Sequence, residues 1–208
     1  MKSRIAVLAS GGGSNLQAIL DYLAALGDRA RAAVEIVISN RSKAGALDRA
    51  RARGIPAVSI AAGAEGSAEL YRLLHDQNVD LVVLAGYLKL VPPAVVHHYD
   101  GRLLNIHPAL LPSFGGVGMY GLRVHQAVLD SGALVTGATA HLVSEEYDRG
   151  AILAQWPVPV LPHDDAATLA ARVLKVEHWL YPRVVHAVAA RGEIVLDGAP
   201  PFSFSESP

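Results

Sequence analysis

Short, continuous apolar runs alternate with helical patterns along the first half of this 208-residue chain. An apolar run of this kind is typical of a strand buried on both faces, as in parallel sheets covered by helices. The strands are expected at residues 5–9, 34–38, 57–60 and 81–85, and the helices at residues 16–26, 44–53 and 67–75. This alternation predicts an α/β fold with a Rossmann-like, mostly parallel twisted sheet and helices on both faces.

The second half is less regular and predicts a mixed C-terminal part of the sheet. Two β-prone runs, residues 135–143 and 152–160, are separated by a short polar loop and are expected to pair antiparallel. The other expected elements are a strand at 103–107, a glycine-rich loop at 114–121, a helix at 122–129, a helix at 166–191 and a strand at 193–196. The helix at 166–191 is either continuous or interrupted near Pro182. We expect one domain over residues 1–197 and a loose tail, rich in Pro and Ser, over residues 198–208.

Charge and composition exclude several classes of protein. The chain has 18 basic and 19 acidic residues, so we expect no nucleic-acid partner and no anionic membrane surface. It has no cysteine, which excludes disulfides, thiolate zinc sites and cysteine nucleophiles and is compatible with a reducing cytoplasm. No apolar run approaches the roughly 18 residues of a membrane-spanning helix, and the histidines have no metal-binding spacing. We therefore expect a cytoplasmic protein without a metal.

Asn105 and His107 are the strongest candidates for chemistry. They lie two residues apart at the end of an expected strand, which Pro108 terminates because it has no N–H for the ladder. Residues i and i+2 of a strand face the same side, and ligands of open α/β sheets bind at the carboxyl ends of strands. An amide beside an imidazole can stabilise an oxyanion and move a proton. The alternative is that His107 is a structural histidine with its hydrogen bonds satisfied.

The glycine-rich segment at residues 10–15 joins an expected strand to an expected helix. Exposed N–H groups and the positive end of the helix make such a turn a natural phosphate site, and Ser14 with Gln17 fits a capping box. The alternative is a tight turn that binds nothing. The segment lacks the Gly-Lys-Ser/Thr of a P-loop, and Leu16 replaces the third glycine of the dinucleotide fingerprint. A monophosphate therefore fits better than a nicotinamide cofactor.

Three other features have both a structural and a functional interpretation. Asp148 is either a turn aspartate before Gly150 or a carboxylate that orients His107 and stabilises its charged form. His141 lies in a β-prone run and faces either the same cleft as His107 or the core. Residues 86–93 follow an expected strand and form either the wall of a pocket for a flat heterocycle or an ordinary strand–helix loop.

Taken in order, these motifs resemble the folate-dependent phosphoribosylglycinamide formyltransferases over about residues 3–197. The resemblance rests on residues 10–18 (SGGGSNLQA), 84–87 (LAGY), 101–108 (GRLLNIHP), 110–112 (LLP) and 147–150 (YDRG), and on Arg172-Val173, Glu177-His178 and Tyr181-Pro182. The glycine-rich segment alone is a weak signal. The Asn-x-His-Pro segment followed by Leu-Leu-Pro is specific to folate formyltransferases.

The resemblance implies the formyltransferase fold, an activity and a set of site residues. The substrates would be glycinamide ribonucleotide and 10-formyltetrahydrofolate as formyl donor, without a metal, in a monomer or homodimer. The first half, about residues 1–100, would bind the nucleotide, and residues 101–197 would hold the catalytic and folate sites. The implied catalytic residues are Asn105, His107 and Asp148; the ribonucleotide residues are Gly12, Gly13, Ser14, Asn15 and Glu177; and the folate residues are Leu88, Lys89, Leu90, Val91, Asn105 and His141.

Two residues depart from the family pattern on the folate side. Ala68 stands where relatives usually have an arginine that contacts the folate, with Arg72 a turn later, and Lys89 stands where an arginine is common. The rival activities in the same group would be expected to need a further domain, a basic C-terminal one for methionyl-tRNA formyltransferase or an N-terminal regulatory one for formyltetrahydrofolate hydrolase. A sugar-nucleotide formyltransferase usually lacks this phosphate loop. The rival outside the group is a phosphometabolite-binding protein without catalysis.

Overall fold

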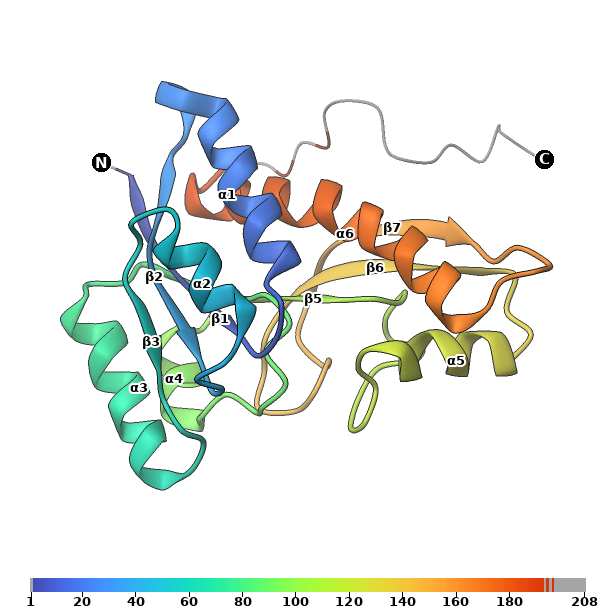
Figure 1. The fold of residues 1–208 in the computed structure, drawn as a ribbon, viewed down its shortest axis with the longest axis horizontal. Helices are drawn as coiled ribbons and strands as arrows, with labels where there is room; N and C mark the ends of the chain where they lie inside the picture. The colour runs from blue at the N-terminus through green and yellow to red at the C-terminus, as the bar shows by residue number, and fades with distance from the viewer. Residues whose placement is uncertain (1, 193, 195, 197–208) are drawn as a thin grey trace.

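The computed structural model describes residues 2–192, 194 and 196, which contain one seven-stranded sheet (Figure 1). The strand order is β3-β2-β1-β4-β5-β6-β7. The strands are β1 (Ser3–Ala9), β2 (Ala32–Ser39), β3 (Ala57–Ser59), β4 (Leu81–Leu84), β5 (Leu103–His107), β6 (Val135–Leu142) and β7 (Ile152–Pro159). Each strand expected between residues 5 and 160 is therefore present, with ends close to the expected ones.

The sheet is parallel in its first five strands and antiparallel in its last two. β1 pairs in parallel with β2 and β4, β2 with β3, and β4 with β5, whereas β6 pairs antiparallel with β5 and β7. The predicted α/β class, with its mixed C-terminal part, is confirmed. The chain builds outward from β1 to β3 and then from β4 to β7, so a topological switch point lies between β1 and β4. Ligands of open α/β sheets bind at such points, beyond the carboxyl ends of the strands.

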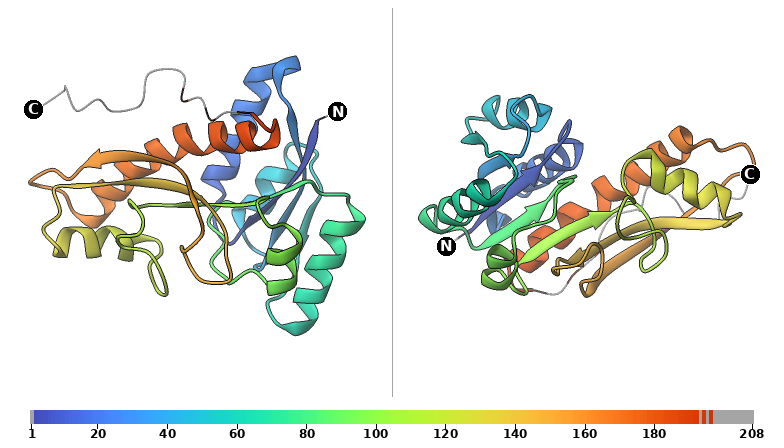
Figure 2. Two further views of the ribbon diagram at one scale, coloured as in Figure 1. Left: turned by 180° about the vertical axis from the view of Figure 1, so that it is seen from behind. Right: turned by 90° about the horizontal axis from the view of Figure 1, so that it is seen from below.

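Helices cover both faces of the sheet (Figure 2). In β1, Ile5 and Val7 belong to one hydrophobic core while Ala6 and Leu8 belong to another, because successive strand residues face opposite sides. The first core includes α1 (Ser14–Leu26), α2 (Gly45–Arg51) and α6 (Ala166–Ala189), and the second includes α3 (Ala64–Asp76) and α4 (Pro93–His98). The remaining helix, α5 (Leu122–Asp130), contacts α6.

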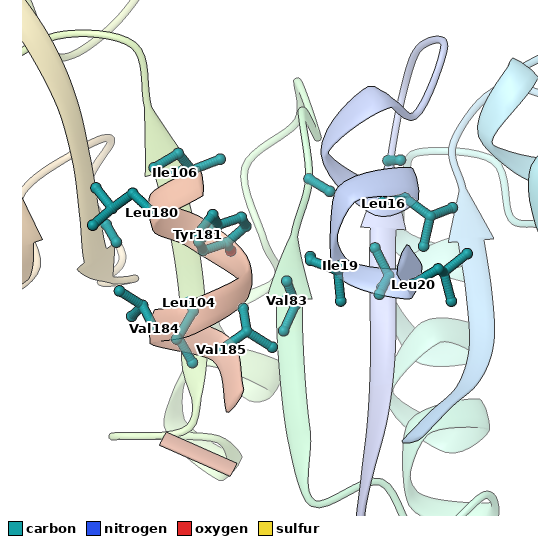
Figure 3. Close-up of a cluster of buried hydrophobic side chains, with 14 of the residues drawn as sticks. Leu16, Ile19, Leu20, Val83, Leu104, Ile106, Leu180, Tyr181, Val184 and Val185 are labelled. Atoms are coloured by element: carbon teal, nitrogen blue, oxygen red, sulfur yellow. The ribbon is translucent and has the colours of Figure 1, made fainter. Parts of the chain in front are cut away.

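The packing of α6 on the sheet positions one wall of the functional region. Figure 3 shows α1 and α6 over the central strands, with Leu180 and Tyr181 of α6 near Ile106 of β5. The fully buried Tyr181 hydroxyl donates a hydrogen bond of 2.9 Å to the carbonyl oxygen of Leu84, the last residue of β4. This bond fixes α6 at the carboxyl end of β4. Glu177, about one helical turn before Tyr181, is thereby brought to the same edge of the sheet.

The helix α6 is continuous, so the alternative of an interruption near Pro182 is wrong. Proline removes one helical N–H, but the residues around Pro182 are buried on both sides of it, and their packing holds the helix together. Its start is defined by a capping box that the sequence pattern did not reveal. Thr168 N–H donates to Asp165 Oδ1 at 2.7 Å, and Asp165 N–H donates to Thr168 Oγ1 at 2.9 Å.

Three local expectations differ from the structure or are not covered by it. The capping box of Ser14 with Gln17 is not formed, because the N-cap of α1 is Gly13 in the left-handed region (φ 75°) and Ser14 is already helical. The sequence pattern defined no bounds for the short helix α4, which starts with Pro93. The strand expected at residues 193–196 and the tail at 198–208 lie outside the described residues, except for positions 194 and 196, which are not in a strand.

Candidate active site

A cleft of about 670 Å³ opens at the switch point of the sheet. Its walls come from the start of α1, the segments that follow β4 and β5, the end of β6, the loop before α5, and one side of α6. Of the residues named from the sequence, those that line it are Asn15, Leu88, Lys89, Leu90, Val91, Asn105, His107, His141, Asp148 and Glu177. Gly12, Gly13 and Ser14 lie beside it at the end of β1 without lining it.

His107 and Asp148 lie side by side in a buried part of the cleft wall. The two side chains are 4% and 9% exposed, and His107 Nδ1 lies 3.5 Å from Asp148 Oδ2. The same carboxylate oxygen accepts the Gly116 N–H at 2.9 Å. His107 Nε2 is 2.8 Å from the carbonyl oxygen of Phe114, which only accepts, so Nε2 carries a proton. An additional proton on Nδ1 would complete an imidazolium at ion-pair distance from Asp148.

Asn105 and His141 are direct partners across the β5–β6 ladder. His141 Nδ1 donates to the carbonyl oxygen of Leu142 at 2.7 Å, so in the neutral ring Nε2 has no proton and accepts from Asn105 Nδ2 at 3.0 Å. Burial lowers the pKa of His141, which keeps this ring neutral. His141 Nε2 is also 3.7 Å from Asp148 Oδ1. Asn105, His107, His141 and Asp148 therefore form one group, which we call the catalytic cluster after the role that we propose for it.

His125 is a third imidazole at the cleft that the sequence analysis missed. It lies on α5 and is 4% exposed, and its Nδ1 has no hydrogen-bond partner in the described part of the chain. Burial, with a smaller contribution from nearby His107, lowers its pKa to about 4. The available signal was its position among Val124 and Val128, which marks it as part of the buried stripe of the helix.

The glycine-rich turn after β1 is held from behind by α2. Ala46 N–H donates to the Gly11 carbonyl at 3.1 Å, and Arg49 Nε donates to the Gly12 carbonyl at 2.7 Å. A Cβ on Gly13 would lie 2.8 Å from the Cα and Cβ of Ala46, so both the positive φ and this approach require glycine. In the described residues, the N–H groups of Gly11, Gly12 and Gly13 have no hydrogen-bond acceptor. They remain available beside the N-terminus of α1.

Asn15 and Glu177 meet where α1 and α6 border the cleft. Asn15 Nδ2 donates to Glu177 Oε2 at 2.6 Å. Burial raises the pKa of Glu177 to about 6, and the hydrogen bond from Asn15 opposes this shift. Asn15 Oδ1 is buried and has no partner among the described residues. A buried acceptor without a donor is costly unless a ligand or water completes it.

The segment that follows β4 lines the cleft mainly with aliphatic side chains. Leu88 and Leu90 are 37% and 45% exposed, and Val91 is buried in the second core. Lys89 is exposed at the cleft. Ala68 and Arg72, on α3, do not line it.

Two further properties concern ions and membranes. In the described part of the chain, no group of three or more His, Asp or Glu side chains is arranged to hold a metal ion. No helix in the same part of the chain is long and apolar enough to cross a membrane.

Comparison with known proteins identifies the family. A family described as formyl transferase matches residues 3–185. The chain is 41% identical over 213 residues to the chloroplastic phosphoribosylglycinamide formyltransferase of Vigna unguiculata, covering 100% of this chain and 68% of that protein. It is 42% identical to phosphoribosylglycinamide formyltransferase of Escherichia coli K12, covering 87% of this chain and 84% of the relative.

A solved structure has the same fold. Glycinamide ribonucleotide transformylase 1 from Symbiobacterium toebii superposes with a TM-score of 0.83 at 39% sequence identity, covering 91% of this chain and 89% of the other. The match in sequence thus extends to the arrangement of the sheet and helices that carry the cleft. This chain belongs to the formyl transferase family.

Proposed function

We propose that this formyl transferase moves the formyl group of 10-formyltetrahydrofolate onto the amino group of glycinamide ribonucleotide, a step of de novo purine (IMP) biosynthesis. The observation that supports this most is the catalytic cluster, in which an amide, two imidazoles and a carboxylate converge beside a phosphate-type turn. The names of the bacterial and plant relatives support the same activity. No nucleic acid or membrane takes part.

In the proposed reaction, the amine nitrogen of the ribonucleotide attacks the formyl carbon, and the carbonyl oxygen becomes an oxyanion. Asn105 donates to the oxyanion through the amide hydrogen that His141 does not take, and His107 donates from its ring. The bond from carbon to the folate nitrogen then breaks, and that nitrogen receives a proton through His107 while the attacking amine loses one. Asp148 stabilises the ring when it is charged. No nucleophilic side chain is needed.

The substrate sites that we propose come from the resemblance, and the positions of the remaining residues support them. The N–H groups of the turn, from Gly12 and Gly13 to Ser14 and Asn15, hold the phosphate and ribose, with Glu177 beside them. The folate ring lies against Leu88, Lys89, Leu90 and Val91, next to Asn105 and His141. In this proposal the nucleotide binds mainly to the half before residue 101, and the chemistry takes place mainly in the half after it.

The test is an absorbance assay for tetrahydrofolate release, with 10-formyltetrahydrofolate present and glycinamide ribonucleotide added or omitted. Release only with the ribonucleotide supports the transferase. Release without it indicates a hydrolase, and no release with the folate bound indicates a binding protein or a different amine acceptor. The same preparation gives the oligomeric state by light scattering, where we expect a monomer or homodimer.

The location of the protein is also part of the proposal. We propose that it acts in the cytoplasm, whereas the relative from Vigna unguiculata is chloroplastic. Fractionation of the source cells, followed by the same assay on each fraction, distinguishes the two compartments.

A further inference from the structure

The segment at residues 87–91 forms one wall of the cleft; Tyr87 and Val91 at its ends pack on the second core, but its backbone makes few hydrogen bonds. It lies between β4 and α4 and is neither helix nor strand. Leu88 and Leu90 are substantially exposed, so their burial contributes little to holding the segment in place. Among the described residues, the Leu88 N–H is the one backbone N–H of this segment with a hydrogen-bond acceptor.

That acceptor is the hydroxyl of Ser10, at 2.9 Å from the Leu88 nitrogen. Ser10 is 1% exposed and begins the glycine-rich turn after β1. Its Oγ donates to Asn40 Oδ1 at 2.6 Å, which turns the hydroxyl hydrogen away and leaves a lone pair for Leu88. Its backbone N–H donates to the Gly86 carbonyl at 3.0 Å. Ser10 thus holds the segment on both sides of Tyr87.

We propose that Ser10 is a positioning residue for the folate site. Its hydroxyl, oriented by Asn40, fixes the path of residues 87–91 before the folate arrives, so that the wall does not have to be ordered on binding. The inference rests on the proposed function, because it takes this segment as the folate wall. Ser10 itself does not line the cleft and touches no reacting atom.

The effect of removing the hydroxyl is expected to be selective for the folate. The ribonucleotide turn has separate support, because Gly11 is held by Ala46 and Gly12 by Arg49. Loss of one buried hydrogen bond at Leu88 is expected to weaken folate binding roughly three- to tenfold. The ribonucleotide affinity and kcat at saturating folate should stay within about twofold of wild type.

The experiment compares Ser10→Ala with Ser39→Ala in the full chain. Ser39 is a matched control, since it is fully buried at the carboxyl end of the neighbouring strand β2 and its Oγ also accepts a loop N–H, that of Arg41, at 3.0 Å. In the described part of the protein it has no hydrogen bond to residues 87–91. The dissociation constants for tetrahydrofolate and for glycinamide ribonucleotide are measured by calorimetry, together with KM, kcat and the exchange rate of the Leu88 amide.

The proposal expects a raised dissociation constant and KM for the folate and faster Leu88 exchange in S10A, with neither change in S39A. It is overturned if S10A matches S39A in folate affinity, or if S10A weakens both substrates by the same factor. Should S10A fail to fold, Asn40→Ala decides, because Asn40 is partly exposed; a selective folate loss of roughly two- to threefold is then expected, and no loss overturns the proposal. If wild type neither binds tetrahydrofolate nor turns over, the proposed function itself fails, and this inference fails with it.

Discussion

Two polar regions lie in or beside the cleft, and they differ in whether their hydrogen-bonding groups already have partners within the protein. In the catalytic cluster, the side chains of Asn105, His107, His141 and Asp148 bond to one another or to nearby backbone groups. In the second region, which we call the ribonucleotide region (residues 11–15 with Glu177), the glycine N–H groups and Asn15 Oδ1 have no partner within the described residues.

Under the proposed function, this difference separates the residues that carry out the chemistry from those that bind the substrate. A cluster whose bonds are already made within the protein is preorganised, and its members act on charge that develops in the transition state. A region with unused donors and acceptors gains most when a ligand completes them. Removing a member of the first region should therefore cost rate, and removing a member of the second should cost affinity.

The largest effect is expected from the catalytic cluster. Asn105→Ala should lower kcat roughly 10²–10³-fold because one oxyanion donor is lost, and His107→Ala should lower it at least about 10²-fold. The KM for the ribonucleotide should change little. Steady-state kinetics on variants with wild-type circular dichroism checks this, and near-normal rates in both variants would remove these residues from the mechanism.

Asp148→Asn removes the negative charge of this side chain while keeping its size and the backbone conformation of the loop. Asp148 has a φ of 57°, a conformation that asparagine also adopts readily, so the loop should keep its form. The Gly116 N–H keeps an acceptor, but the His107 ring loses the carboxylate beside its Nδ1. We expect a fall in kcat of roughly 10- to 100-fold. A pH–rate profile unchanged from wild type would show that the carboxylate charge has no part in the reaction.

Glu177→Gln tests the opposite region. The amide still accepts from Asn15 but loses the charge, so ribonucleotide affinity should fall roughly tenfold or more, while kcat at saturation stays close to wild type. Calorimetry with the ribonucleotide gives the first quantity and saturation kinetics the second. A large loss in kcat instead would place Glu177 with the catalytic cluster and break the contrast.

The free energy of unfolding of Glu177→Gln, compared with that of wild type, is expected to depend on pH. The pKa of Glu177 is raised to about 6 from 4.5, so the folded state holds the proton more tightly than the unfolded state. Its contribution to stability is present below pH 4.5 and is lost as the pH rises through about 6. At pH 8, the neutral Glu177→Gln variant should therefore be more stable than wild type by about 1–2 kcal/mol in urea unfolding, with no such gain at pH 4.

His125 does not fit the contrast between the two regions. It lies near His107 of the catalytic cluster, but among the described residues its Nδ1 has no hydrogen-bond partner, as is the case for Asn15 Oδ1 in the ribonucleotide region. Its pKa is lowered from 6.5 to about 4, so the unfolded state binds the proton more tightly. The associated stability is present above pH 6.5 and is lost as the pH falls towards 4. His125→Gln should reduce the loss of stability between pH 8 and pH 5 by about 1–2 kcal/mol. Equal losses of stability in wild type and H125Q between the two pH values would contradict this.

Much of this arrangement could be predicted from local pattern. The apolar runs identified the strands, and the i, i+2 rule placed Asn105 and His107 on one side of β5. The residues alone left Asp148 and His141 open, because their proximity depends on the β5–β6 register and on a loop conformation. The catalytic role of Asp148 and the place of His141 in the folate site came from the resemblance and stay predictions.

What could not be predicted depended on tertiary contacts. Ser14 and Gln17 satisfy the capping pattern, but the N-cap is Gly13, which adopts a left-handed conformation close to Ala46. His125 fits a helical stripe, yet only the packing of α5 turns that stripe toward the cleft. A proline such as Pro182 often marks the end of a helix. Here the burial of the residues around it stabilises the helix by more than the lost backbone hydrogen bond costs.

The hydrogen bond from His107 Nε2 to the Phe114 carbonyl has a consequence for fidelity. In the proposed mechanism this contact occupies the Nε2 proton, so His107 can give that proton to a substrate only when the Phe114 carbonyl no longer accepts it. We therefore expect the balance between formyl transfer and loss of the formyl group to water to depend on how tightly one backbone carbonyl holds one proton.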